Sequence, residues 1–145
     1  MQKKVIVVLV GLFLIVGLQT CNLIIEKRAV NSVMTQILNN NQKYRQFKWT
    51  ELMNSSPSDR AFVVSLYAIN VILCPKDFKV AFYGYANAWK EIVESSEKYA
   101  GLNGTVRILT HGPEFYERTA GMMNLGDKLN KAALNLQTIA AKYTK

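Results

Sequence analysis

The residues of this chain that could take part in chemistry are two cysteines, one histidine and a short row of glutamates. Cys74 stands immediately before Pro75, where we expect a helix to begin, and Lys76 and Lys79 follow. A helix N-terminus and nearby cations lower the pKa of a thiol and make it nucleophilic. The alternative is that Cys74 is a small core residue, because free cysteine is among the most buried residue types.

His111 is the only histidine, and no recognisable catalytic or metal-binding set surrounds it. Metal sites in helical bundles need Glu-x-x-His pairs, and zinc sites need closely spaced Cys and His; the sequence has neither. A G-x-S-x-G turn for a nucleophilic serine is also missing. We therefore predict no metal, no cofactor and no catalytic residues. A thiol-dependent enzyme or redox sensor using Cys74, with His111 as base, is the alternative.

The glutamates Glu91, Glu94 and Glu97 follow one another at three-residue spacing along a predicted helix. Paired carboxylates can perform acid–base catalysis. Lys90 and Lys98, however, each lie four residues from Glu94, which favours a solvated helix face with ion pairs.

Aromatic residues on the same predicted helix form a stripe at helical spacing, which predicts a buried face rather than a ligand platform. The stripe consists of Phe78, Phe82, Tyr85, Trp89, Ile92 and Val93. Tyr83 falls outside this stripe, and Lys79 and Lys90 are also expected on the exposed side. These three residues are the binding-surface candidates.

The first element that must position these residues is an apolar N-terminal segment. Lys3 and Lys4 precede fourteen uncharged residues, 5–18, and residues 23–25 continue the apolar character up to Glu26. As one helix, residues 5–25 would rise roughly 30 Å, enough to cross a bilayer. This pattern predicts a membrane or export segment, residues 1–25, followed by a domain, residues 26–145.

Three interpretations of the segment remain open. An uncleaved signal anchor is favoured by its length and by the lack of a small-x-small cleavage site. A lipoprotein signal with an acylated Cys21 is suggested by Leu18-Gln19-Thr20-Cys21, which resembles a lipobox except at Thr20. An ordinary cleaved signal is the third. In the anchored form, we expect the short N-terminus inside and the C-terminal body in the periplasm.

The body is predicted to be all-α, a small bundle of three or four helices. We expect a helix with an apolar stripe from Ala29 to Leu38, which the asparagines 39–41 weaken or end. Ser58 is the expected N-cap of a second helix, the core helix over residues 61–73. A third helix begins at Pro75, and a fourth follows Pro113. Residues 106–109 are the only strand-like piece.

The stretch Cys74-Pro75-Lys76-Asp77-Phe78, with Ala81, Tyr85, Ala88 and Trp89, resembles small uncharacterised helical proteins of the bacterial envelope. The similarity covers about 16 residues and implies a helical, exported protein without a specified activity.

The net charge of +8 falls to +6 when Lys3 and Lys4 are assigned to the N-terminal segment. The remaining basic residues are scattered rather than clustered, so nucleic-acid binding is only a further alternative. We predict a non-enzymatic, membrane-tethered or exported protein with a binding or structural role in the cell envelope. Its expected partners are the membrane through residues 5–25, anionic lipid headgroups, and another envelope protein or a second copy, but no nucleic acid.

Overall fold

The computed structural model describes residues 2–44, 57–100 and 113–144. They form four helices: α1 (Gln2–Tyr44), α2 (Pro57–Tyr67), α3 (Lys76–Ala100) and α5 (Pro113–Thr144). Within these ranges there is no strand, and the prediction of an all-helical bundle is confirmed. The strand-like residues 106–109 and His111 lie outside the described residues.

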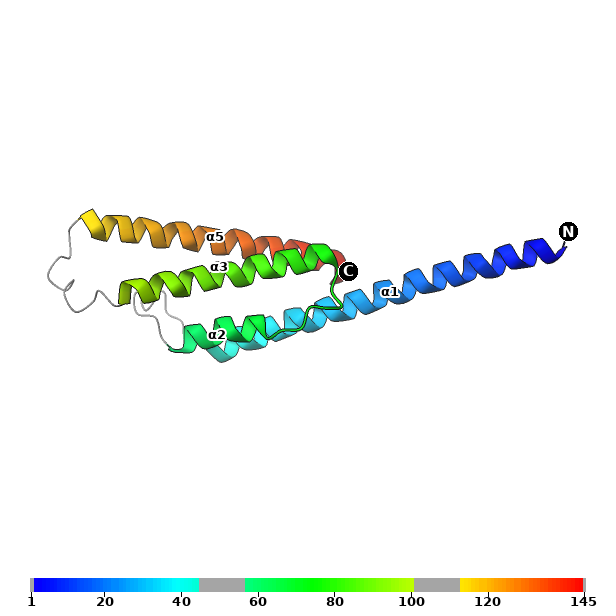
Figure 1. Cartoon of the computed structure of the whole chain (residues 1–145), viewed down its shortest axis with the longest axis horizontal. Helices are drawn as coiled ribbons and strands as arrows, with labels where there is room; N and C mark the ends of the chain where they lie inside the picture. The colour runs from blue at the N-terminus through cyan, green and yellow to red at the C-terminus, as the bar shows by residue number, and fades with distance from the viewer. Residues whose placement is uncertain (1, 45–56, 101–112, 145) are drawn as a thin grey trace.

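The four helices form an up-and-down bundle in which consecutive helices run in opposite directions (Figure 1). Helix α3 packs along α5, and α2 lies between α1 and α3. Helix α1 also contacts α5, which closes the ring of four helices around a common core. This is the arrangement expected when amphipathic helices bury their apolar stripes against one another.

Helix α1 is much longer than its neighbours, and its N-terminal part projects beyond the bundle (Figure 1). Its 43 residues correspond to about 65 Å at 1.5 Å per residue. Among its described side chains, which begin at Thr20, Val30 is the first buried one, followed by Val33 and Ile37. Over the part of the chain whose side chains the structure describes, which in α1 begins at Thr20, no helix is long and apolar enough to cross a membrane.

The expected weakening of this helix at the asparagines 39–41 is wrong, because α1 continues to Tyr44. Asparagine costs only about 0.7 kcal/mol per position relative to alanine in a helix. Ile37 is buried and Tyr44 packs partly buried against the core, with its ring 6.0 Å from that of Phe62. These contacts on either side of the asparagines hold the helix together. Leu38, predicted on the apolar stripe, is instead 58% exposed.

The core is centred on the aromatic stripe of α3. Phe78 and Phe82 are completely buried, together with Leu66 of α2 and Val30 of α1. The predicted stripe is confirmed, with Tyr85, Ile92 and Val93 buried and Trp89 partly buried. Helix α5 adds Leu129, Leu136 and Ala140 to the core. Each helix therefore contributes one apolar face, as an amphipathic sequence requires.

The predicted core helix over residues 61–73 is wrong in its second half, because α2 ends at Tyr67. The side-chain carbonyl of Asn70 accepts a hydrogen bond from the Ile72 N–H at 2.9 Å, and Cys74 N–H donates to the Val71 carbonyl at 3.0 Å. An asparagine that bonds nearby backbone offers an alternative to the helix. The chain therefore turns over residues 68–75, and α3 begins at Lys76.

Candidate functional site

Cys74 lies inside the bundle rather than at its surface. Its side chain is only 5% exposed and belongs to the hydrophobic core. Desolvation by burial raises the pKa of the Cys74 thiol, and the positive charge of Lys79 only partly opposes this effect. Both findings favour the structural role of Cys74 over that of a reactive thiolate.

We expect Cys74 of the folded chain to react with iodoacetamide at pH 6 at least about tenfold more slowly than a free thiol, because both burial and the raised pKa suppress the thiolate. Mass spectrometry of the modified peptide over time measures the rate. In the same chain unfolded by urea, Cys74 should react like any exposed cysteine. A folded-state rate equal to or above that of a free thiol would restore the thiol-enzyme alternative.

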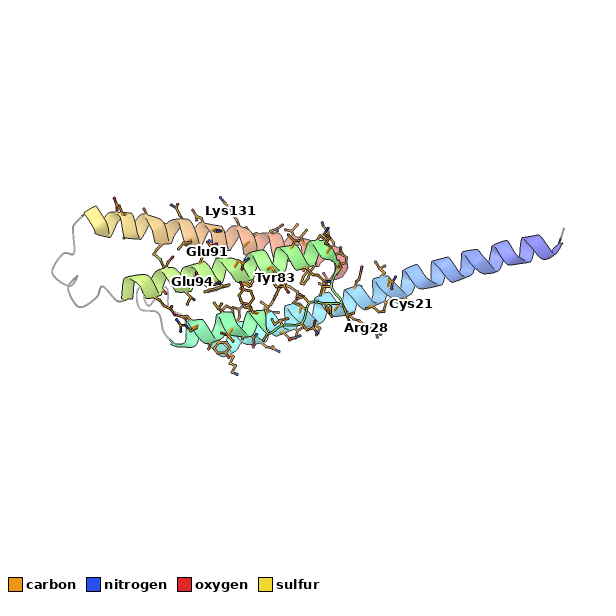
Figure 2. All side chains as sticks on the ribbon, in the orientation of Figure 1. Cys21, Arg28, Tyr83, Glu91, Glu94 and Lys131 are labelled. Atoms are coloured by element: carbon orange, nitrogen blue, oxygen red, sulfur yellow. The ribbon has the colours of Figure 1, made fainter. Side chains whose placement is uncertain are left out.

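Cys21 lies on the projecting part of α1 (Figure 2), whereas Cys74 belongs to the core of the bundle. It is exposed, and both cysteines are free. The structure therefore brings no second thiol to Cys74. His111, the base considered for a Cys74 enzyme, lies outside the described residues. Among the described residues, no group of three His, Cys, Asp or Glu side chains is placed to hold a metal ion.

Each of the three glutamates of α3 pairs with a cation, and two of the pairs join different helices. The pairs are Arg60–Glu97, Lys128–Glu91 and Lys90–Glu94, with N–O distances of 2.7, 2.6 and 3.6 Å. The predicted pair within α3, Lys90–Glu94, is confirmed, whereas the Lys98 side chain lies outside the described residues. Carboxylates that are each neutralised by a cation suit a solvated, position-fixing role rather than acid–base catalysis.

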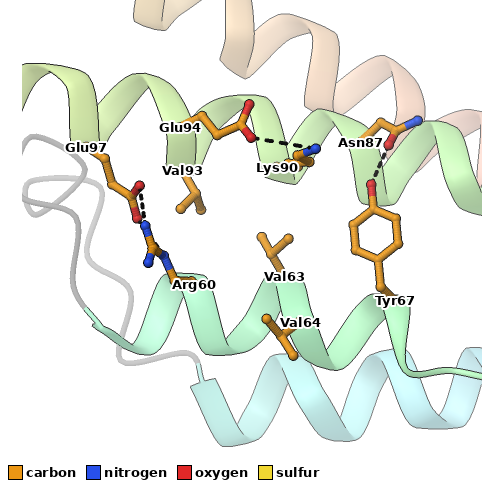
Figure 3. A pocket seen from close by; sticks show the side chains of 9 residues that line it. All are labelled: Arg60, Val63, Val64, Tyr67, Asn87, Lys90, Val93, Glu94 and Glu97. Carbon is orange, nitrogen blue, oxygen red and sulfur yellow. Dashed lines mark hydrogen bonds and ion pairs between the residues drawn. The ribbon is translucent and has the colours of Figure 1, made fainter.

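A groove of about 730 Å³ with both apolar and polar lining lies between α2 and α3 (Figure 3). We call it the α2–α3 groove. Val63 and Val93 form its apolar floor and are 8% and 5% exposed, whereas Val64, which also lines it, is 63% exposed. Its lining residues are Arg60, Val63, Val64, Tyr67, Asn87, Lys90, Val93, Glu94 and Glu97.

Hydrogen bonds across the groove fix its two ends (Figure 3). At one end, Arg60 donates two hydrogen bonds to the two carboxylate oxygens of Glu97, at 3.0 and 2.7 Å. At the other, the Tyr67 hydroxyl donates to the Asn87 side-chain oxygen. These bonds set the spacing of α2 and α3 and leave an apolar floor framed by polar groups. Such a surface suits binding, because apolar contacts supply affinity and polar groups fix orientation.

Of the three residues predicted to form a binding surface, Tyr83 and Lys90 share one face of α3, whereas Lys79 lies at the end of the bundle. Lys90 lines the α2–α3 groove. Tyr83, 44% exposed, lies four residues before Asn87 on the same face of α3, and its ring packs edge-on against Phe82 at 5.4 Å. Lys79 instead donates a hydrogen bond to the Ile72 carbonyl at 2.7 Å, at the end of the bundle.

Arg60, Tyr67 and Asn87 were not predicted from the sequence as binding-surface residues. Their pairings span 37 residues for Arg60 with Glu97 and 20 for Tyr67 with Asn87. No local spacing rule connects such positions, since periodicity assigns a face to each helix separately. Only the packing of α2 against α3 brings them together.

A second polar cluster ties the start of α3 to the end of α5. The Tyr143 hydroxyl donates to Asp77 Oδ1 at 2.8 Å, the Phe78 N–H donates to the same oxygen at 2.8 Å, and Lys142 Nζ lies 3.5 Å from Oδ2. Desolvation alone would raise the pKa of Asp77, but these hydrogen bonds and the Lys142 charge together lower it. The hydrogen bond to Asp77 is the main cause that raises the pKa of Tyr143 to about 12.

We expect the bundle to lose stability in acid, because the stabilising contribution of the ionised Asp77 carboxylate is lost there. Because its folded-state pKa is lowered, its contribution is complete above the unfolded value of 3.8 and is lost as the pH falls through the folded-state pKa. The side chain is 40% exposed, so this contribution is at most about 1 kcal/mol.

Thermal unfolding followed by circular dichroism between pH 6 and 2 tests this expectation. Asp77→Asn should lower the melting temperature by a few degrees at pH 6 and should flatten its decline below pH 4. Equal acid sensitivity of the two chains would show that Asp77 does not carry this effect.

Comparisons of the chain with models of protein families, with curated proteins and with solved structures found no match.

Proposed function

We propose that this chain is a non-enzymatic helical protein of the bacterial cell envelope, tethered to the inner membrane by residues 5–25. The bundle then stands in the periplasm and has a binding role. The observation that carries the proposal is the form of α1. Its C-terminal part packs in the bundle from Val30 onward, whereas the preceding part projects from the bundle in one continuous helix (Figure 1).

Exposed apolar residues support the use of the projecting part as an anchor. Leu23, Ile24 and Ile25 are 61%, 51% and 46% exposed, although aliphatic side chains of this size favour burial. They continue the uncharged residues 5–18 up to Glu26. A helix retained in the bilayer gives these three residues an apolar environment at its edge, which favours the uncleaved anchor.

Lipid attachment at Cys21 is the alternative form of the same tether. Cys21 is exposed and lies nine residues before Val30, so an acylated Cys21 would leave a short helical spacer before the bundle. Both forms place the same end of the bundle towards the membrane. They differ in the mass of the mature chain and in the fate of residues 1–20.

Reporter fusions test the orientation. With alkaline phosphatase fused to the C-terminus, we expect activity, because that enzyme folds only after export to an oxidising compartment. A fluorescent reporter that folds in the cytoplasm should stay dark at the same position. The reverse pattern would contradict a periplasmic bundle.

The α2–α3 groove is the proposed binding surface, and its chemistry suits an amphipathic segment of another envelope protein. The valine floor would receive apolar side chains, and Arg60, Lys90 and Glu94 offer charges of both signs at the rim. A photo-crosslinking residue at Val64, 63% exposed in the groove, should capture a partner in cells. The same probe at Leu134, also 63% exposed but on α5, is the matched control.

Equal capture from the two positions would remove the groove from the proposal. A crosslinked adduct of twice the chain mass would identify the occupant as a second copy of the protein. That the protein does not bind nucleic acid stays a prediction. Three cations of the described surface, Arg60, Lys90 and Lys128, are paired with carboxylates.

A further inference from the structure

We propose that the turn between α2 and α3 is a second membrane contact, in which Ile72 and Leu73 enter the headgroup region of the bilayer. This inference rests on the proposed anchoring by residues 5–25. It adds that the bundle itself sits against the membrane surface rather than hanging freely from its anchor. We call residues 70–75, which contain Ile72 and Leu73, the membrane-facing turn.

The membrane-facing turn holds two large aliphatic side chains outward. Ile72 and Leu73 are 71% and 62% exposed, whereas Val71 and Cys74 on either side are each 5% exposed. The buried side chains of Val71 and Cys74 fix the turn to the core. Ile72 and Leu73, which stand between them, are left on the solvent side of the turn. Two adjacent exposed aliphatic residues at a tip are a feature of surfaces that bind membranes or proteins.

Hydrogen bonds hold the turn in this shape. The Ile72 N–H donates to the Asn70 side chain at 2.9 Å, and Lys79 Nζ donates to the Ile72 carbonyl at 2.7 Å. The Cys74 N–H closes the turn on the Val71 carbonyl at 3.0 Å. Both backbone polar groups of Ile72 therefore have partners within the protein, which lowers the cost of moving this residue into an apolar environment.

The membrane-facing turn lies at the end of the bundle from which the anchor leaves. Helix α2 stops short of this end, and the segment that follows it leads there to the start of α3, beside the end of α5 (Figure 1). The hydrogen bond between Asp77 and Tyr143 joins the last two elements, and the charge of Glu26 on α1 also acts on Tyr143. The exposed residues Leu23 to Ile25 immediately precede Glu26 in α1. Two separate apolar features thus meet the solvent at one end of the molecule.

The charges around this end fit an anionic lipid surface better than a neutral protein surface. Five basic residues and two acidic residues, Glu26 and Asp77, occupy the segments that meet there. The basic residues are Lys27, Arg28, Lys76, Lys79 and Lys142. Of these, Lys142 also lies 3.5 Å from Asp77, and Lys79 also donates to the Ile72 carbonyl. Aliphatic residues bordered by Lys and Arg are the combination that binds membrane interfaces, since the cations reach the phosphates beside the inserted side chains.

Tryptophan scanning of the full chain in vesicles tests the proposal. The probes are Leu73→Trp at the turn, Met123→Trp as a matched exposed position (69% exposed) on the distant part of α5, and Phe13→Trp in the anchor. Trp49 and Trp89 give the same background in every variant. Each chain is reconstituted in vesicles with about one-third anionic lipid. Three lipid mixtures are compared: one without bromine, one brominated near the headgroup end of the chains, which reports on Leu73→Trp and Met123→Trp, and one brominated near the terminal end of the chains, which reports on Phe13→Trp.

We expect brominated lipid to quench about half of the fluorescence added by Leu73→Trp and almost none of that added by Met123→Trp, because an interfacial residue lies only about 5–10 Å deep. Ile72→Trp should repeat the result. Because both positions are exposed, neither variant disturbs the core. Replacing the anionic lipid with a zwitterionic one should reduce the quenching at Leu73→Trp at least about twofold.

The outcomes separate this inference from the proposed function. Quenching of Phe13→Trp without quenching of Leu73→Trp would keep the anchor and overturn the second contact. A blue shift of Leu73→Trp without quenching would mean that a protein, such as a second copy, covers the turn, which also overturns it. No quenching of Phe13→Trp would overturn the anchor and the inference together. Equal quenching of Leu73→Trp in anionic and in zwitterionic vesicles would contradict the part of the proposal in which the basic residues bind lipid phosphates.

Discussion

Replacing Phe82 with alanine is expected to lower the free energy of unfolding of the bundle by about 3–5 kcal/mol. Phe82 is completely buried on α3, the helix that packs against both α2 and α5. Its ring also contacts Tyr83 edge-on at 5.4 Å. The removed ring leaves a cavity in the centre of the core that rigid neighbouring helices can fill only in part.

Chemical denaturation of the chain in mild detergent, followed by far-ultraviolet circular dichroism, measures this effect. Leu134→Ala is the matched control, because Leu134 is 63% exposed on α5 and its loss should cost only about 0.5 kcal/mol. A loss below about 1 kcal/mol for Phe82→Ala would contradict the position of Phe82 at the centre of the core.

Placing arginine at both Leu9 and Leu14 is expected to abolish integration of the chain into the membrane. Both positions lie within the uncharged residues 5–18 and within α1. One arginine at the centre of a membrane helix costs about 2.5–3.5 kcal/mol, so two cost about 5–7 kcal/mol. A single short anchor cannot offset that penalty, and the chain should disappear from the carbonate-resistant membrane fraction.

The control carries the same charge at exposed positions of the bundle. Met123→Arg together with Leu134→Arg changes two side chains that are 69% and 63% exposed, and should leave membrane association intact. Immunoblotting of carbonate-washed membranes compares the two double variants with the parent chain. Retention of the Leu9→Arg, Leu14→Arg chain at the parental level would mean that residues 5–18 are not the anchor.

The sequence predicts the core better than it predicts the ends of the helices. The stripe from Phe78 to Val93 follows the helical period closely, so its burial could be predicted from spacing alone. The end of α2 could not, because residues 61–73 are almost wholly apolar and contain neither Gly nor Pro. In the turn that follows α2, the Asn70 side chain accepts a hydrogen bond from the Ile72 N–H, a local alternative to the helix that hydrophobic spacing does not reveal.

The candidate binding surface depends on tertiary packing and was largely beyond sequence reasoning. Lys90 could be assigned to an exposed face, but its neighbours Arg60 and Tyr67 come from another helix. The same holds for Lys128, which reaches Glu91 from α5. For Cys74 the local sequence is misleading. Its position before Pro75 suggests an accessible helix start, but the turn places its thiol in the core.

The intact mass of the chain isolated from carbonate-washed membranes tests the central claim, anchoring by a retained N-terminal helix, most directly. We predict an unprocessed chain of 16.4 kDa. A chain that begins at Cys21 and carries a diacylglycerol group would contradict the retained anchor and establish the lipid-anchored form. A shorter unmodified chain, recovered only in the soluble fraction, would contradict membrane tethering altogether.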